Sequence, residues 1–158
     1  MRRVLVLIFL SLFLATTAGA AGNHQEFGNN KYPDCIYAAD ANLEETYNPG
    51  VILTNAQVIQ AFQANGESYG LAFMQITGFD GITANITPMG TSIVGLQAAV
   101  AVGGVQAFVR FPYQGEHAIA VIAATNTRVE FVSWGYTYWW SLKEYKANVY
   151  QQYSFTWN

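Results

Sequence analysis

The chain has 158 residues, of which 11% are charged and 52% are hydrophobic, and its formal net charge at pH 7 is −3. The acidic balance argues against nucleic acid and anionic membrane surfaces as partners. There is no low-complexity tract, internal repeat or long linker, so an extensively disordered chain is also excluded.

The N-terminal segment has the pattern of a secretory signal peptide. Arg2 and Arg3 precede an apolar run over residues 4–15, and small residues occupy positions 18–20. A basic start, a short apolar stretch and a small-x-small site predict cleavage after position 20. The run is too short to cross a bilayer comfortably, so an uncleaved membrane anchor is the less favoured alternative.

Removal of residues 1–20 leaves 138 residues, which we expect to form a single domain over residues 21–158. That part carries five basic and ten acidic residues, a net charge of −5. No later stretch is long and apolar enough for a membrane span. The expected location is therefore secreted or periplasmic, with no integral membrane segment after cleavage.

The first predicted helix covers residues 34–47, after a start signal that includes Asp34 as an N-cap, and the N-P-G sequence at 48–50 ends it. Its apolar residues recur at spacings of three and four. Asp40 and Glu44 lie one turn apart, and we expect them on a solvated face. The residues expected on the buried face are Ile36, Ala39, Leu43 and Tyr47.

Two further helices are predicted in the next stretch. Thr54 and Gln57 can form a capping box that begins a helix ending before Gly66. A weaker helix is expected over residues 68–77. The alternating run I-T-A-N-I-T at 82–87 then predicts an edge strand.

One more helix is expected before the pattern changes to sheet beyond Gly104. Residues 92–104 are expected to be helical, with Ser92 as N-cap and Gly103 as the stop. A capping box from Ser141 to Glu144 predicts a short later helix. Helices first and mostly antiparallel strands afterwards are typical of the α+β class. The β-branched and aromatic segments expected to be strands are 105–111, 117–124, 128–134 and 149–157.

Cys35 is the only cysteine, so the chain cannot form an intramolecular disulfide. An odd thiol in an exported chain indicates intermolecular pairing or a reactive group, although a buried structural cysteine is the plain alternative. In the first turn of a helix, unpaired N–H groups and the helix dipole favour the thiolate. Cys35 is therefore a candidate nucleophile.

A nucleophilic cysteine needs a base, usually a histidine. His24 lies in the polar N-terminal tail, whereas His117 begins a predicted strand directly after a turn. A histidine at the rim of a sheet can point towards a helix packed on that sheet. The alternative for His117 is a solvated or hydrogen-bonded turn residue.

A helix starts at D-C and is followed by G-G-V-Q-A-F-V-R-F-P, G-E-H-A-I-A-V-I-A and V-E-F-V-S-W-G. This order of motifs along the chain resembles the papain-like cysteine peptidase superfamily. Within it, the likeness is to small bacterial bacteriocin-leader (double-glycine) peptidase-like domains. It extends from about Asn29 to Trp157. The resemblance implies a papain-like fold, with N-terminal helices packed on a mostly antiparallel C-terminal sheet, and a peptidase or amidase that works through a thioester.

The family's roles transfer to single positions of this sequence. Cys35 matches the nucleophile, His117 the base, and Asn29 the residue whose amide helps to bind the oxyanion. Active members carry Asn or Asp where this chain has Val132, and valine cannot orient an imidazole. Ser133 could replace that residue only weakly, since an alternating strand points it to the face opposite Val132.

Other chemistry is less favoured. A carbohydrate-binding platform is possible, although aromatic strands more often build a core, and its members would be Trp134, Tyr136, Tyr138, Trp139, Trp140 and Trp157. No second acidic or histidine cluster joins the carboxylates of the first helix, so we expect neither a metal nor a cofactor. Two hypotheses remain: a cysteine peptidase-like hydrolase acting on peptides or proteins, and a catalytically inactive relative that serves as an exported binding or interaction module.

Overall fold

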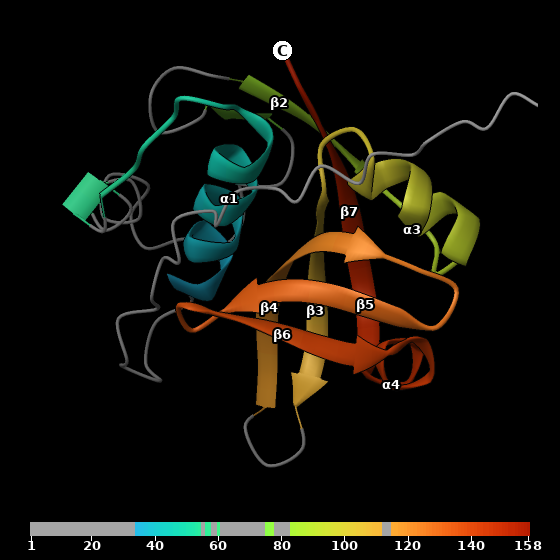
Figure 1. Ribbon diagram of the computed structural model, residues 1–158. Helices are drawn as coiled ribbons and strands as arrows, with labels where there is room; N and C mark the ends of the chain where they lie inside the picture. The colour runs from blue at the N-terminus through green and yellow to red at the C-terminus, as the bar shows by residue number, and fades with distance from the viewer. Residues whose placement is uncertain (1–33, 55, 58–59, 61–74, 78–82, 112–114) are drawn as a thin grey trace, which may run out of the picture.

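The computed structural model describes residues 34–54, 56–57, 60, 75–77, 83–111 and 115–158. Helices flank a single bent sheet in this part of the chain (Figure 1). The elements, in chain order, are α1 (Asp34–Tyr47), β1 (Gln75–Thr77), β2 (Thr83–Pro88), α3 (Ile93–Val100), β3 (Val105–Phe111), β4 (Gly115–Ala124), β5 (Arg128–Ser133), β6 (Tyr136–Ser141), α4 (Leu142–Asn148) and β7 (Val149–Trp157).

The sheet has seven strands in the order β1-β2-β7-β3-β4-β5-β6, and every neighbouring pair is antiparallel. The α+β class predicted from the sequence is confirmed. The strand expected at the edge, β2, instead lies between β1 and β7, so the edges of the sheet are β1 and β6.

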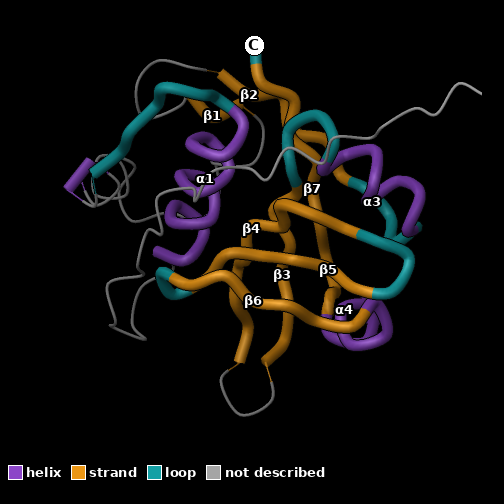
Figure 2. Tube along the Cα trace, in the orientation of Figure 1, coloured by secondary structure: helices purple, strands orange, loops and turns teal. Residues whose placement is uncertain are grey.

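Two irregularities bend this sheet. One is in β4, where the register shifts between Val121 and Ala123; the other is in β7, where Tyr150 is the extra residue opposite Phe108 and Val109 of β3. Such bulges increase the local twist and bend a strand. In consequence β5 and β6 run across β3 and β7, with α1 on one side and α3 on the other (Figure 2).

The two faces of the sheet bury two separate apolar clusters. We call the face covered by α1 the helix face, and the opposite face, against which Leu96 of α3 and Tyr145 of α4 pack, the inner face. Because successive side chains of a strand point to opposite faces, residue parity assigns them. Ala118 and Ala120 of β4 belong to the helix face, whereas Ile119 belongs to the inner face.

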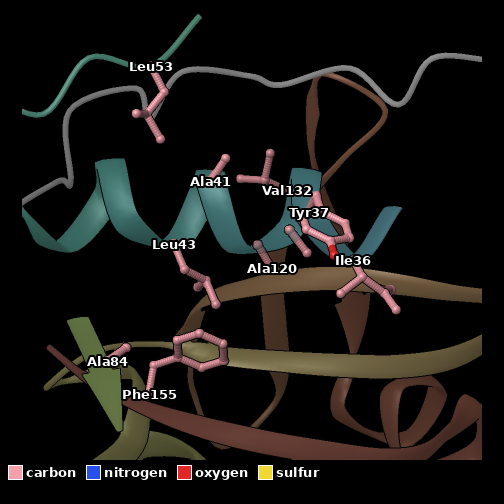
Figure 3. Close-up of a cluster of buried hydrophobic side chains, with 11 residues drawn as sticks. Ile36, Tyr37, Ala41, Leu43, Leu53, Ala84, Ala120, Val132 and Phe155 are labelled. Atoms are coloured by element: carbon pink, nitrogen blue, oxygen red, sulfur yellow. The ribbon is translucent and has the colours of Figure 1, made fainter. Parts of the chain in front are cut away.

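Helix α1 is buried around its whole circumference, since every residue from 36 to 44 is buried. Leu43 faces Phe155 of β7, and Leu53 covers the side of α1 that is turned away from the sheet (Figure 3). At the end of the helix, the hydroxyl of Tyr47 donates to the carbonyl oxygens of Val100 and Ile122, at 2.7 and 3.2 Å. These contacts make α1 a central element of the fold.

The predicted caps at Ser92, Ser141 and Thr54 are confirmed, whereas Asp34, predicted as the N-cap of the first helix, is the first residue of α1. Ser141 and Glu144 form the capping box of α4, and Ser92 caps α3 through the N–H of the third helical residue. Thr54 and Gln57 also bond reciprocally, with the Gln57 N–H donating to Thr54 Oγ1 at 3.3 Å and Gln57 Oε1 accepting from the Thr54 N–H at 2.8 Å. Local side-chain chemistry therefore fixes these chain positions.

Three expectations differ from the structure. Residues 75–77, expected to end a weak helix, form strand β1, and β6 was not predicted at all. The turn after α3 places the positive φ of 84° at Gly104 rather than at Gly103. A Cβ at Gly104 would lie 2.5 Å from Leu43 Cδ2, so close packing against α1 also requires glycine there.

Candidate functional site

Cys35 occupies the first turn of α1, as the sequence predicted, and its half-buried side chain packs against the helix-face cluster. Cys35 acts electrostatically on Tyr150, which lies at the bulge of β7. The pKa of Tyr150 is raised to about 12, first by burial and next by the Glu116 carboxylate, to which its hydroxyl is hydrogen-bonded. The charge of Arg110 lowers this pKa, and that of Cys35 raises it further. At neutral pH Tyr150 is therefore a phenol that donates a hydrogen bond and cannot act as a base.

His117 lies near the start of β4, and its surroundings differ from those of Cys35 because its side chain is on the inner face. Its register partner on β3 is Val109, a member of the inner-face cluster. Its ring stacks on Trp134 with 4.4 Å between ring centroids and contacts Phe111 edge-on at 5.6 Å. With 9% exposure, this imidazole is almost closed off from solvent.

Ser133 is the hydrogen-bond partner of His117, with 2.6 Å between Oγ and Nε2. Val132, by contrast, points to the helix face and packs among the residues under α1. The alternation expected for β5 is thus present. The residue after Val132 therefore supplies a hydrogen-bond partner of the imidazole.

The structure does not bring Cys35 and His117 together. Cys35 packs on the helix face with Ala118 and Ala120, while His117 precedes them by an odd number of residues and points to the inner face. Side chains on opposite faces of a strand cannot exchange a proton directly, because the sheet backbone lies between them. This placement gives no support to a direct Cys35–His117 pair, whose catalytic roles stay predictions from the sequence, and Asn29, the third expected site residue, lies outside the described residues.

Asp40 and Glu44 also depart from expectation. They were assigned to a solvated face, but their exposed fractions are 2% and 1%. The carboxylate of Asp40 accepts a hydrogen bond from Gln106 Nε2 at 2.6 Å, and Gln106 also donates to the carbonyl of Ile36 at 3.2 Å. Burial, followed by the nearby Glu44 carboxylate, raises the pKa of Asp40 well above its ordinary value.

Nothing in the local sequence distinguishes these acids from surface residues. Their burial follows from the covering of α1 on all sides, which depends on distant segments. One signal was present: Gln106 in β3 is a polar residue in an otherwise apolar strand core, and a buried amide needs a partner. No group of three or more His, Cys, Asp or Glu side chains among the described residues is arranged to hold a metal ion.

The aromatic residues considered for a carbohydrate platform do not share one surface. Trp140 packs on the inner face against Phe111 and Phe131, with ring centroids 5.0 and 4.9 Å apart. Trp139 is 46% exposed on the edge strand β6 and has the guanidinium carbon of Arg128 4.3 Å from its ring centroid. A flat row of these tryptophans is therefore excluded.

Within the part of the chain that the structure describes, no helix is long and apolar enough to span a membrane. Comparison with known proteins found no matching family model, no matching curated protein and no matching solved structure.

Proposed function

We propose that the chain is an exported binding or interaction module on a papain-like fold, in which Cys35 and His117 do not act as a catalytic pair. The observation that carries this proposal is the position of the two side chains on opposite faces of the sheet. The surroundings of both groups suit a structural role. Cys35 packs against the helix-face cluster, and His117 stacks on Trp134 and is hydrogen-bonded to Ser133.

Support for the papain-like part of the proposal comes from the arrangement of segments. The helix that starts next to Cys35 is central and buried, and it packs on an antiparallel sheet. The H-A sequence lies near the start of β4, and S-W-G spans the end of β5 and its turn. These features agree with the resemblance of the sequence motifs and are independent of activity.

The groups around Cys35 also favour a module without thiol catalysis. Tyr150 keeps its proton at neutral pH, because its pKa is raised to about 12. Glu116 is engaged by Tyr150 and by Arg110, whose Nη2 lies 3.5 Å from the Glu116 Oε1. A general base for the thiol must be held within hydrogen-bond reach and oriented by a third group, as the imidazole is in a triad.

The test compares the alkylation of Cys35 by iodoacetamide, across pH 5 to 10, in the wild-type protein and in His117→Gln. Glutamine can keep the hydrogen bond to Ser133, and circular dichroism will show whether the variant is folded. We expect identical pH profiles and no hydrolysis of labelled casein by either protein. Hydrolysis that disappears in both Cys35→Ala and folded His117→Gln would establish a peptidase and overturn the proposal.

A further inference from the structure

Strand β6 leaves one side of its backbone open. Among the described strands it is the last of the sheet and pairs only with β5. The N–H of Leu142 donates to the carbonyl of Thr127 at 2.8 Å, which fixes the alternation of the antiparallel ladder. Because bonded and non-bonded pairs alternate, the N–H and C=O groups of Thr137, Trp139 and Ser141 point away from β5.

The open stretch has two defined ends. Towards α4, the outward N–H of Ser141 is already used, since it donates to Glu144 Oε2 at 3.1 Å. Towards β5, Trp134 and Gly135 form the hairpin turn, with φ of 47° and 76°. Positive φ at both central residues is the mark of a type I′ turn, whose closing pair is hydrogen-bonded within the hairpin.

What remains open is the backbone of Thr137 and Trp139. No hydrogen bond to these outward groups occurs within the described part of the chain. Exposed strand edges of this kind are templates for pairing with another chain, and proteins usually shorten or block them. The opposite edge strand, β1, is only three residues long. Strand β6 has six residues and an exposed tryptophan instead of a lysine or proline at its centre.

Charge distinguishes this corner of the molecule from the rest. Residues 127–148, which form β5, β6 and α4, contain three basic and two acidic residues, Arg128, Lys143, Lys146, Glu130 and Glu144. The remainder of the chain has four basic and eight acidic residues. The corner therefore carries a net charge of +1 on an otherwise acidic chain. Its two carboxylates are Glu144, in the capping box, and Glu130, the cross-strand partner of Trp139.

We propose that the open edge of β6 binds an extended acidic peptide segment of a partner protein, which joins the sheet as an added strand. Backbone bonds to Thr137 and Trp139 provide the affinity, as in other cases of strand addition. Arg128, which lies over the ring of Trp139, provides the preference for acidic side chains. This inference rests on the proposed function, for which it names the class of partner.

The test uses a fluorescein-labelled eight-residue peptide of alternating valine and glutamate, with a valine–lysine twin, and measures fluorescence polarisation at low salt. We expect the acidic peptide to bind at least about tenfold more tightly than the twin, with a difference that shrinks as salt is added. Equal binding of the two peptides, or binding of neither, contradicts the proposal.

Thr137→Pro tests the edge itself. Proline removes the outward N–H of Thr137, which is not part of the ladder with β5, and Thr137→Val is the matched control that keeps it. We expect Thr137→Pro to weaken binding about tenfold or more, which corresponds to about 1.4 kcal/mol, while Thr137→Val binds as the wild type does. If Thr137→Pro does not fold, the same loss must appear with a peptide N-methylated at alternate residues.

A folded Thr137→Pro that binds the acidic peptide normally overturns the proposal. The proposal is also overturned if no peptide binds and the protein instead forms a concentration-dependent dimer that Thr137→Pro abolishes. In that case a second copy of the chain occupies the edge. Both results leave the thiol measurements on Cys35 and His117 unaffected, so failure of this inference is distinguishable from failure of the proposed function.

Discussion

Asp40 offers the sharpest test of how the centre of the fold is built. Its side chain is 2% exposed on α1, and its carboxylate accepts a hydrogen bond from Gln106 Nε2. Burial, together with the Glu44 carboxylate one turn away, raises its pKa in the folded protein. Asp40→Asn keeps the shape and the carbonyl-type acceptor but removes the ionisable group, so it isolates the contribution of ionisation to stability.

The sign of the effect follows from proton linkage. An acid whose pKa is higher in the folded than in the unfolded state binds its proton more tightly when folded. Its contribution to stability is therefore complete below the unfolded pKa of about 3.9 and decreases as pH rises towards the folded pKa. In that window a single such group changes the free energy of unfolding by up to about 1.4 kcal/mol for each pH unit.

The measurement is urea unfolding at pH 4, 5, 6 and 7, followed by tryptophan fluorescence, for the wild type and Asp40→Asn. We expect the stability of the variant relative to the wild type to increase with pH, at a slope approaching 1.4 kcal/mol per unit at the steepest point. Thr137→Val, at an exposed position and without any change of ionisable group, is the control and should give a nearly constant difference. A constant difference for Asp40→Asn as well would mean that the carboxylate ionises normally in the folded protein, and the reasoning fails.

Two further substitutions test the packing around the site by the same unfolding assay. Gly103→Ala places a Cβ 2.2 Å from the backbone oxygen of Phe155 and should lower the free energy of unfolding by about 2–3 kcal/mol. Gly90→Ala, where a Cβ would have no atom within 4 Å, should change it little. Equal stabilities of the two variants would contradict this reasoning. Trp140→Ala removes an inner-face ring and should cost about 3–5 kcal/mol, but exposed Trp139→Ala should cost less than about 1 kcal/mol. A larger loss at Trp139 would show that the edge strand is covered.

Much of the sheet was predictable because its signals are local. The predicted segments 105–111 and 149–157 coincide with β3 and β7. Both are rich in β-branched and aromatic residues, and their starts are marked by Gly104 and by the end of the capped helix α4. The capping box at Ser141 likewise places α4 between two strands. Residues within a few positions of one another supply all of these signals.

Features that depend on distant contacts were not predictable. Strand β6 follows a two-residue turn in which Trp134 takes a positive φ, a conformation that large side chains rarely adopt and that the sequence therefore does not announce. The stack of Trp134 on His117 accompanies this conformation. The burial of Asp40 depends in the same way on Gln106, which lies on a strand 66 residues later.

The expected pairing of Cys35 with His117 depends on strand phase as well as on proximity in the fold. Motif spacing brings His117 to the strand that packs beside α1, and in that respect the sequence reasoning was sound. However, the side-chain period of a strand is two, so a shift of one residue exchanges the faces of the sheet. Glu116, the preceding residue, acts on Tyr150 together with Cys35. The thiol packs on the helix face, whereas the imidazole of the next residue stacks on Trp134 on the inner face.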